Sequence, residues 1–298
     1  MSLGGAPGAT WLITGAGGLL GTTLAPTLRD AGHDVVALTR AELDVTDRSA
    51  VDEALLTHRP AVVVNTAAYT AVDDAEEHED EALRINGIGP AVLATSAAAA
   101  ESAPVLLHVS TDYVFAGDAT TPYAEDAPTA PRTAYGRTKL AGEQEVRTLL
   151  PRRGFVVRTA WLYGPGGGNF VSTMLRLENE RETLEVVDDQ RGQPTSTLVL
   201  SRRLRELGER ALADAAPAGV YHGTASGETT WFGLAREVFR LIGADPERVR
   251  PTTSDAFVRP APRPAYSVLG HDAWARIGLG PAPDWRDALA EALPSMRP

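Results

Sequence analysis

Tyr135 and Lys139 form the residue pair whose spacing most clearly suggests chemistry. They stand four residues apart in "TAYGRTKLAGE" (133–143), and Lys139 is the only lysine among the 28 Lys and Arg residues. In a helix this spacing puts both side chains on one face. A tyrosine titrates near pH 10, and a nearby ammonium stabilises its phenolate and lowers that pKa. The pair therefore predicts a tyrosine that transfers a proton beside a compact charge that arginine would not replace.

A third reactive group is expected where an apolar run ends. "LLHVSTDYVF" places Ser110, Thr111, Asp112 and Tyr113 after a predicted strand. A hydroxyl of Ser110 or Thr111 could hydrogen-bond a substrate carbonyl while Tyr135 donates the proton. Such residues also serve in ordinary turns, so this interpretation depends on the other motifs.

A glycine-rich turn follows the first predicted strand. In "LITGAGGLLG" the glycines stand at the start of a predicted helix, where a dinucleotide pyrophosphate can approach the backbone and meet the helix N-terminus. A plain tight turn is the alternative. The cofactor-binding candidates in this turn are Gly15, Gly17, Gly18, Leu19, Leu20 and Gly21.

The end of the second predicted strand, "ALTRAELDVTD", is expected to contact the adenosine ribose. Thr39 and Arg40 stand there, and an arginine suits the 2′-phosphate of NADPH better than the free hydroxyl of NADH. We therefore expect NADPH, with NADH as the alternative because Glu42 could reach a ribose. Arg40 could also be an ordinary surface charge.

The order of the predicted elements indicates the fold. Apolar runs at 10–15, 34–39, 61–67, 104–111 and 154–160 alternate with helical stretches at 18–31, 48–58, 76–101 and 133–150. This order is typical of a parallel sheet covered on both faces. We predict an α/β Rossmann-type, doubly wound sheet over residues 1–163 and a smaller C-terminal α/β substrate-binding domain over 164–298. Segments at about 184–222 are expected to return to the sheet, and the proline-rich stretch from 250 to 267 to form an ordered loop over a site.

The composition restricts the partners. The net charge of −11 argues against a nucleic-acid or anionic membrane surface, and the chain has no cysteine. The start "MSLGGAPGA" lacks the features of a signal peptide, and no apolar run is long enough to cross a bilayer. We expect a cytoplasmic protein that binds neither nucleic acid nor membrane.

These motifs resemble those of the extended short-chain dehydrogenase/reductases, most closely the dTDP-4-dehydrorhamnose reductase family. The resemblance covers essentially the whole chain and is carried by "TGAGGLLG" (14–21), "VNTAAYTAVDDAE" (64–76), "STDYVF" (110–115), "YGRTKLAGE" (135–143), "RTAWLYG" (158–164), "VVDDQRGQPT" (186–195) and "RPAYSVL" (263–269). It implies NADPH-dependent reduction of the C4 keto group of dTDP-4-dehydrorhamnose to dTDP-L-rhamnose. The alternatives are a related dTDP-4-keto-6-deoxyhexose ketoreductase, an epimerase or dehydratase, and a non-catalytic NADP-binding regulatory subunit.

The resemblance also implies roles for particular residues. Thr111, Tyr135 and Lys139 correspond to the catalytic triad. Some relatives use a Glu at a magnesium-linked dimer interface where this chain has Thr23, so no metal is expected, and a monomer or a homodimer remains open. The other implied cofactor contacts are Asp44, Val45, Ala67, Ala68 and Tyr69, and the implied substrate contacts are Thr111, Asp112, Tyr113, Tyr135, Trp161, Asn169, Phe170, Gln193 and Arg263.

Overall fold

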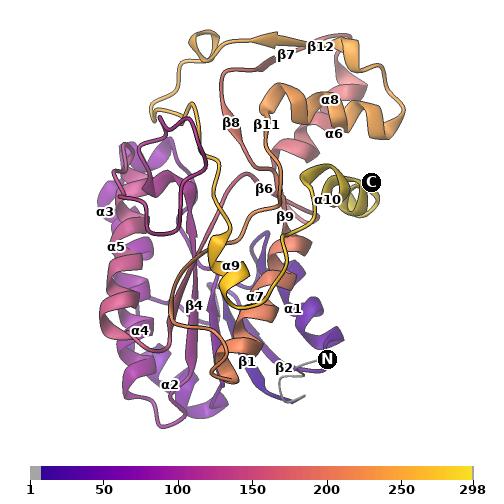
Figure 1. The fold of residues 1–298 in the computed structure, drawn as a ribbon. Coiled ribbons are helices and arrows are strands. Elements are labelled where there is room, and N and C mark those ends of the chain that lie inside the picture. The colour runs from indigo at the N-terminus through magenta and orange to yellow at the C-terminus, as the bar shows by residue number, and fades with distance from the viewer. Residues whose placement is uncertain (1–7, 297–298) are drawn as a thin grey trace.

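A six-stranded, fully parallel sheet forms the base of the molecule (Figure 1). The computed structural model describes residues 8–296, so the N-terminal residues that bear on a signal peptide lie outside it. The strand order is β10-β5-β4-β3-β1-β2. The strands are β1 (Thr10–Thr14), β2 (Asp34–Leu38), β3 (Val62–Asn65), β4 (Val105–Thr111), β5 (Gly154–Thr159) and β10 (Gly219–His222). The Rossmann-type α/β fold is thereby confirmed.

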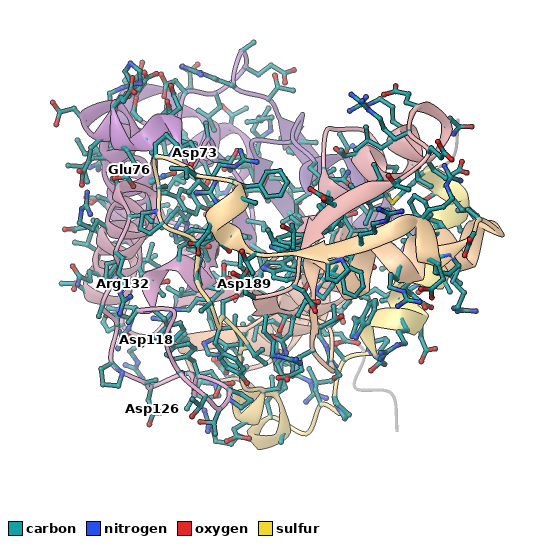
Figure 2. All side chains as sticks on the ribbon, turned by 90° about the horizontal axis from the view of Figure 1, so that it is seen from above. Asp73, Glu76, Asp118, Asp126, Arg132 and Asp189 are labelled. Carbon is teal, nitrogen blue, oxygen red and sulfur yellow. The ribbon has the colours of Figure 1, made fainter. Side chains whose placement is uncertain are left out.

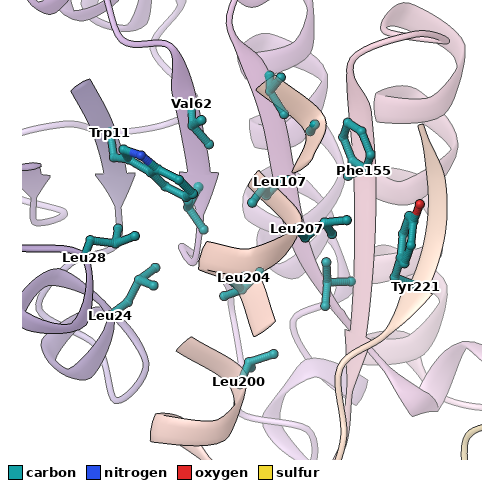
Figure 3. Close-up of a cluster of buried hydrophobic side chains, with 14 of the residues drawn as sticks. Trp11, Leu24, Leu28, Val62, Leu107, Phe155, Leu200, Leu204, Leu207 and Tyr221 are labelled. Carbon is teal, nitrogen blue, oxygen red and sulfur yellow. The ribbon is translucent and has the colours of Figure 1, made fainter. Parts of the chain in front are cut away.

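Helices cover both faces of this sheet. On one face α1 (Gly21–Asp30), α7 (Thr197–Leu212) and α9 (Asp272–Arg276) pack around Trp11, as Figure 3 shows for α1 and α7. On the other face α2 (Arg48–His58), α4 (Gly89–Ala99) and α5 (Ala134–Leu149) pack around Leu12. Neighbouring strand residues point to opposite faces, and this explains why β3, "VVVN", is buried along its whole length.

The remaining elements form a smaller layer beyond the carboxyl ends of the strands (Figure 1). Its core contains Tyr163, Phe239 and Trp285. Short strand pairs join β7 to β12, β8 to β11 and β6 to β9. The elements are β6 (Leu162–Tyr163), α6 (Phe170–Glu180), β7 (Leu184–Val187), β8 (Arg191–Gly192), β9 (Thr195–Ser196), β11 (Thr229–Thr230), α8 (Trp231–Ile242), η4 (Pro246–Arg248), β12 (Val249–Thr252), η5 (Ser254–Ala256), α10 (Trp285–Ala292) and η6 (Leu293–Met296).

The chain passes from the smaller layer back to the sheet and out again. Within the predicted returning segment, α7 packs against α1, and β10 pairs with β5 at one edge of the sheet. The strand β7 of the same segment instead pairs with β12 in the smaller layer. The division of the chain into two domains near residue 163 stays a prediction.

The helix predicted over 76–101 is divided in the structure. It consists of η1 (Asp74–Glu76), α3 (Glu79–Leu83), a wide π-helical turn η2 (Arg84–Ile88) and α4. Pro90 stands in the first turn of α4 and has no N–H to continue the preceding ladder. In the wide turn, the Asn86 side chain accepts a hydrogen bond from Tyr69 N at 2.8 Å. The helical pattern of the sequence over 76–101 did not reveal this break. No helix of the described chain, residues 8–296, is long and apolar enough to span a membrane.

A buried ion pair ties α5 to the sheet. Arg158 in β5 donates from Nη2 to Oε2 of Glu143 at 2.7 Å and from Nε to Oε1 at 3.0 Å. Both side chains are almost fully buried, at 3% and 1% exposure. Glu143 lies one turn after Lys139 on the same helix, so the pair fixes the helix that carries Tyr135 and Lys139.

Removing one member of this pair should destabilise the fold. Glu143→Ala leaves the Arg158 charge buried without its partner, which typically costs about 3–5 kcal/mol of unfolding free energy. Glu79→Ala is the matched control, because Glu79 pairs with Arg137 of the same helix at an exposed position, where a loss of at most about 1 kcal/mol is expected. Urea unfolding measures both variants. Equal losses would contradict an anchoring role for the buried pair.

Candidate functional site

A large cavity lies between the sheet and the smaller layer. Its volume is about 1580 Å³. The turn after β1 and the carboxyl ends of β2, β3, β4 and β5 line one side, and residues from 254 to 264 line another. Ligands of parallel α/β sheets bind at this edge, and the volume is sufficient for a dinucleotide and a second ligand together.

The glycine turn lies at the floor of the cavity and fits a dinucleotide phosphate. Gly15 has φ of +68°, and a Cβ there would lie 2.6 Å from Ala67 N, so only glycine is accommodated. Gly17 and Gly18 line the cavity. The helix α1 starts with neither a side-chain cap nor an acidic residue in its first turn, and such an N-terminus suits an anion.

The end of β2 favours NADPH. Arg40 lines the cavity and is exposed. The Oε2 atom of Glu42 accepts hydrogen bonds from the backbone N and the hydroxyl of Thr39, each at 2.8 Å. The backbone bond is the larger cause of the lowered pKa of Glu42. The Glu42 carboxylate is therefore engaged by Thr39, and the side chain that lines the cavity here is that of Arg40.

Asp44, Val45, Ala67 and Ala68 also line this end of the cavity. The Oδ1 atom of Asp44 accepts hydrogen bonds from Thr46 N at 2.9 Å and from Thr46 Oγ1 at 2.8 Å. The backbone bond is the main reason that the pKa of Asp44 is lowered. These contacts hold the loop after β2 against the place where the adenosine half of a dinucleotide would lie.

The hydroxyl groups predicted to act on the substrate meet at the end of β4. Thr111 donates to Oδ1 of Asp112 at 3.0 Å and accepts from Tyr113 N at 3.2 Å. The rings of Tyr113 and Tyr135 are edge to face, with centroids 5.6 Å apart. Burial raises the pKa of Tyr135 to about 12, and the neighbouring Thr111 hydroxyl opposes this shift. The structure thus brings Thr111, Asp112, Tyr113 and Tyr135 together.

Lys139 lies at the base of this group and is buried, with 1% exposure. Its Nζ donates to the carbonyl of Val109 at 2.7 Å and lies 3.4 Å from Nε2 of His108. Burial lowers the pKa of Lys139 to about 8, although the charge of Glu143 raises it. The sequence predicted an acidified tyrosine. In this structure burial instead keeps Tyr135 protonated, and the lysine is the group whose pKa moves toward neutrality.

Aromatic side chains form the opposite wall. The rings of Trp161 and Trp231 are stacked at 3.6 Å, and Phe170 lies 4.6 Å from Trp231. Trp161 has φ of +47°, a strained conformation for a bulky residue. A Cβ at Gly192 would lie 2.5 Å from the Trp161 ring, so this glycine is needed for the indole to lie where it does.

Two carboxylates hold the proline-rich segment along the cavity. Asp189 accepts from Ser254 Oγ at 2.7 Å and from Ser254 N at 2.8 Å. Asp73 accepts from Arg263 at 2.7 and 2.9 Å. Figure 2, seen from above, shows Asp73 and Asp189 on either side of η5. Between these anchors Phe257 and Val258 are exposed at the cavity lining.

Four of the predicted contacts lie outside the cavity lining. Gly21 packs against Ala16, where a Cβ would lie 2.5 Å from Cα. The Tyr69 hydroxyl is hydrogen-bonded to Asp74. Asn169 caps α6 through Ser172 N at 3.0 Å. The Gln193 side chain bonds Leu269 N at 2.8 Å, Leu269 O at 3.2 Å and Thr224 Oγ1 at 2.9 Å, which makes its contacts structural.

Several lining residues were not predicted from the sequence. Trp231 and Gln190 join the aromatic wall through a 3.1 Å hydrogen bond from Trp231 Nε1 to Gln190 Oε1. Both stand inside conspicuous polar motifs, "SGETTW" and "DDQRGQPT", and this was the available signal. Other lining residues that the sequence did not single out include Arg84, Ile85 and Met174. Val187 stands in the motif "VVDDQRGQPT", and Phe257, Val258 and Arg259 stand in the proline-rich stretch that was expected over a site.

Comparison with known proteins identifies relatives of the chain. The model of the family described as "RmlD substrate binding domain" matches residues 9–297. A dTDP-4-dehydrorhamnose reductase of Streptomyces griseus is 56% identical and is aligned over 97% of this chain and 95% of its own. A probable dTDP-4,6-dihydroxy-2-methyloxan-3-one 4-ketoreductase of Streptomyces antibioticus is 55% identical, over 96% and 95%. The crystal structure of a Bacillus anthracis dTDP-4-dehydrorhamnose reductase in complex with NADP is 36% identical, with a TM-score of 0.90 and coverage of 96% and 99%.

The buried carboxyl of Asp112 yields a pH-dependent prediction. Burial raises its pKa to about 6 from 3.8, opposed by hydrogen bonds including that from Thr111. The folded chain therefore keeps this proton to a higher pH than the unfolded chain, so the contribution to stability is present below pH 4 and is lost as the pH rises through 6. Asp112→Asn removes the charge and should raise the unfolding free energy at pH 7.5 by roughly 3 kcal/mol, with little change near pH 4.

Chemical denaturation at both pH values measures this effect. Asp126→Asn is the control, because Asp126 is exposed, and it should change stability little at either pH. The same gain for Asp112→Asn at pH 4 and at pH 7.5 would contradict a buried charge as its cause.

Proposed function

The chain belongs to the dTDP-4-dehydrorhamnose reductase family, and on that premise we propose that it reduces the C4 keto group of dTDP-4-dehydrorhamnose to dTDP-L-rhamnose. It is an oxidoreductase that uses NADPH. The observation that carries the proposal is the meeting of Thr111, Tyr135 and Lys139 in one cavity with the glycine turn after β1. An intact reactive set of this kind is unnecessary in a protein that only binds NADP, and this disfavours a regulatory subunit.

The residues suit NADPH, and the fit rests on the structure of the turn. The positive φ of Gly15, the backbone around Gly17 and Gly18 and the uncapped start of α1 can receive the pyrophosphate. Arg40 can pair with the 2′-phosphate. The adenosine half would lie against Asp44, Val45, Ala67 and Ala68, which line the cavity. When bound, NADPH supplies the hydride.

Tyr135 donates a proton to the alkoxide oxygen into which the C4 carbonyl is converted. Its raised pKa keeps the phenol protonated at neutral pH, and an alkoxide is a stronger base than the phenolate, so transfer is favourable. Thr111 hydrogen-bonds the same carbonyl oxygen and polarises it. Lys139, buried one turn further along α5, stabilises the phenolate that is left behind.

The sugar and its diphosphate extend toward the aromatic wall. Tyr113, Trp161 and Phe170 offer flat apolar surfaces to the deoxysugar, and Asp112 completes the polar end. Arg263 lines the same space, although Asp73 partly neutralises its charge. Asn169 and Gln193 stay predicted contacts only through the family resemblance, because the structure gives both side chains internal partners.

A second candidate is a reductase of another dTDP-4-keto-6-deoxyhexose. The Streptomyces antibioticus relative, 55% identical, bears the name of such a ketoreductase. The same proton donor and cofactor site would serve it, and only the wall formed by Trp161, Trp231 and the proline-rich segment would select the sugar. In both cases the protein acts in the cytoplasm without a metal, as a monomer or a homodimer, and binds neither nucleic acid nor membrane.

Turnover of the proposed substrate tests the reaction. The purified chain should oxidise NADPH when given dTDP-4-dehydrorhamnose made in situ, and dTDP-L-rhamnose should accumulate. Tyr135→Phe removes the proton donor and should lower kcat by about 10²–10⁴-fold. Tyr266→Phe is the control, since that hydroxyl bonds Glu228 at an exposed site. NADPH binding without consumption would exclude this substrate, and a panel of other dTDP-4-keto sugars would then separate a sibling ketoreductase from a binder.

Cofactor choice tests the role of Arg40. Arg40→Ala removes a charge-assisted contact worth about 1.5–3 kcal/mol, so KM for NADPH should rise about 10–100-fold while KM for NADH stays the same. Arg59→Ala is the control, because Arg59 lies outside the cavity in an exposed pair with Glu101. An equal rise of the KM values for NADPH and NADH would show that Arg40 does not bind the 2′-phosphate.

A further inference from the structure

A line of polar side chains crosses the interior of the sheet and ends at Lys139. Thr14 in β1, Asn65 in β3 and His108 in β4 are direct neighbours in the strand register, so their side chains share one face. All three are at most 1% exposed. Thr14 Oγ1 donates to Asn65 Oδ1 at 2.7 Å, and Asn65 Nδ2 lies 3.0 Å from His108 Nδ1. Since buried polar groups in a parallel sheet are costly unless paired, this line needs an explanation.

The contacts of Asn65 determine which nitrogen of His108 carries the proton. Ala67 N donates to Asn65 Oδ1 at 3.1 Å, and a backbone N–H can only donate. The Oδ1 atom is therefore the acceptor, and Nδ2 is the donor that faces His108. Nδ1 of His108 must accept, which puts the imidazole proton on Nε2. Burial, followed by the charge of Lys139, lowers the pKa of His108 well below its ordinary value, so the ring is neutral.

This tautomer directs an N–H group at Lys139. Nε2 lies 3.4 Å from Nζ. An ammonium offers only N–H groups to that donor, whereas a neutral amine offers its lone pair. On the other side Nζ has the carbonyl of Val109, which accepts a hydrogen bond from either form. The imidazole thus disfavours the charged form of Lys139.

We propose that Thr14, Asn65 and His108 form a positioning relay that fixes the His108 proton on Nε2 and so sets the protonation of Lys139. The relay acts in the same direction as burial, which lowers the pKa of Lys139 to about 8. Under the proposed function, on which this part rests, Lys139 can then lose and regain a proton near neutral pH on the same helix face as Tyr135, the proton donor.

Other charges near Lys139 act more weakly or in the opposite direction. Glu143, on α5, raises the pKa of Lys139 but is itself bound to Arg158 of β5. Asp112, directly after β4, shares the cavity and is ionised only above about pH 6. Tyr135 is protonated throughout the relevant range. Within the relay, His108 is therefore the group whose N–H disfavours the ammonium form of Lys139.

The uniqueness of Lys139 makes a direct measurement possible. Lysine labelled with ¹³C at Cε and ¹⁵N at Nζ gives one side-chain signal, because the chain contains no other lysine. Its titration in the wild-type chain should have a midpoint near pH 8. His108→Leu removes the opposing N–H and should lower the acid dissociation constant of Lys139 on the order of tenfold. His222→Leu is the matched control: it also removes a fully buried strand histidine, but one that contacts Gly270 O, and it should leave the midpoint unchanged.

The tautomer is tested without relying on the variant. Long-range ¹H–¹⁵N correlation of labelled histidine in the wild-type chain should show His108 with a bare Nδ1 and a protonated Nε2, the signal being assigned by its loss in His108→Leu or His108→Gln. A proton on Nδ1, or an unchanged or lowered Lys139 midpoint in His108→Leu, overturns the relay. These readouts need no turnover, so they stand or fall separately from the proposed reaction. If the proposed reaction is measured as well, the decrease of kcat at alkaline pH should move to higher pH in the His108→Leu variant, and KM should stay unchanged.

Discussion

The close approach of α5 to its neighbours is the constraint on which the site depends. Two glycines of this helix have no room for a side chain: a Cβ at Gly136 would lie 2.2 Å from Tyr113 O, and one at Gly142 would lie 2.2 Å from Asn86 O. Gly136 directly follows Tyr135, and Gly142 stands three residues after Lys139. Because the backbone contacts at both places are rigid, the phenol and the amine are fixed relative to the end of β4. The buried ion pair between Arg158 and Glu143 also attaches this helix to β5.

This packing also determines the electrostatics. A helix pressed onto the sheet excludes water from Lys139 and Tyr135, and burial moves both pKa values toward the neutral forms. The helix therefore does more than align two side chains. It gives a phenol that keeps its proton at neutral pH, as a proton donor must, and an amine that loses its proton more easily.

Local patterns predicted the residues that depend on local geometry. The glycine turn, the four-residue spacing of Tyr135 and Lys139 and the polar end of β4 followed from strand and helix periods, and the structure brings these residues to one cavity. The wide turn at Arg84–Ile88 and the aromatic stack of Trp231 on Trp161 did not follow. The latter depends on contacts between residues seventy positions apart, which no local period encodes. The pKa of Tyr135 was expected to fall because its partner charge was visible in the sequence, whereas its burial was not.

The return of α7 and β10 to the sheet has a consequence for how this family can diversify. The segment from 197 to 222 follows residues of the aromatic wall in the sequence, yet its side chains complete the core around Trp11 and Leu107. Recombination between relatives that exchanged everything after β6 would bring a foreign α7 against a resident α1. A productive chimera must keep this segment with the N-terminal half and exchange the flanking pieces at two junctions, so a new sugar wall is more readily acquired by point substitution than by a single crossover.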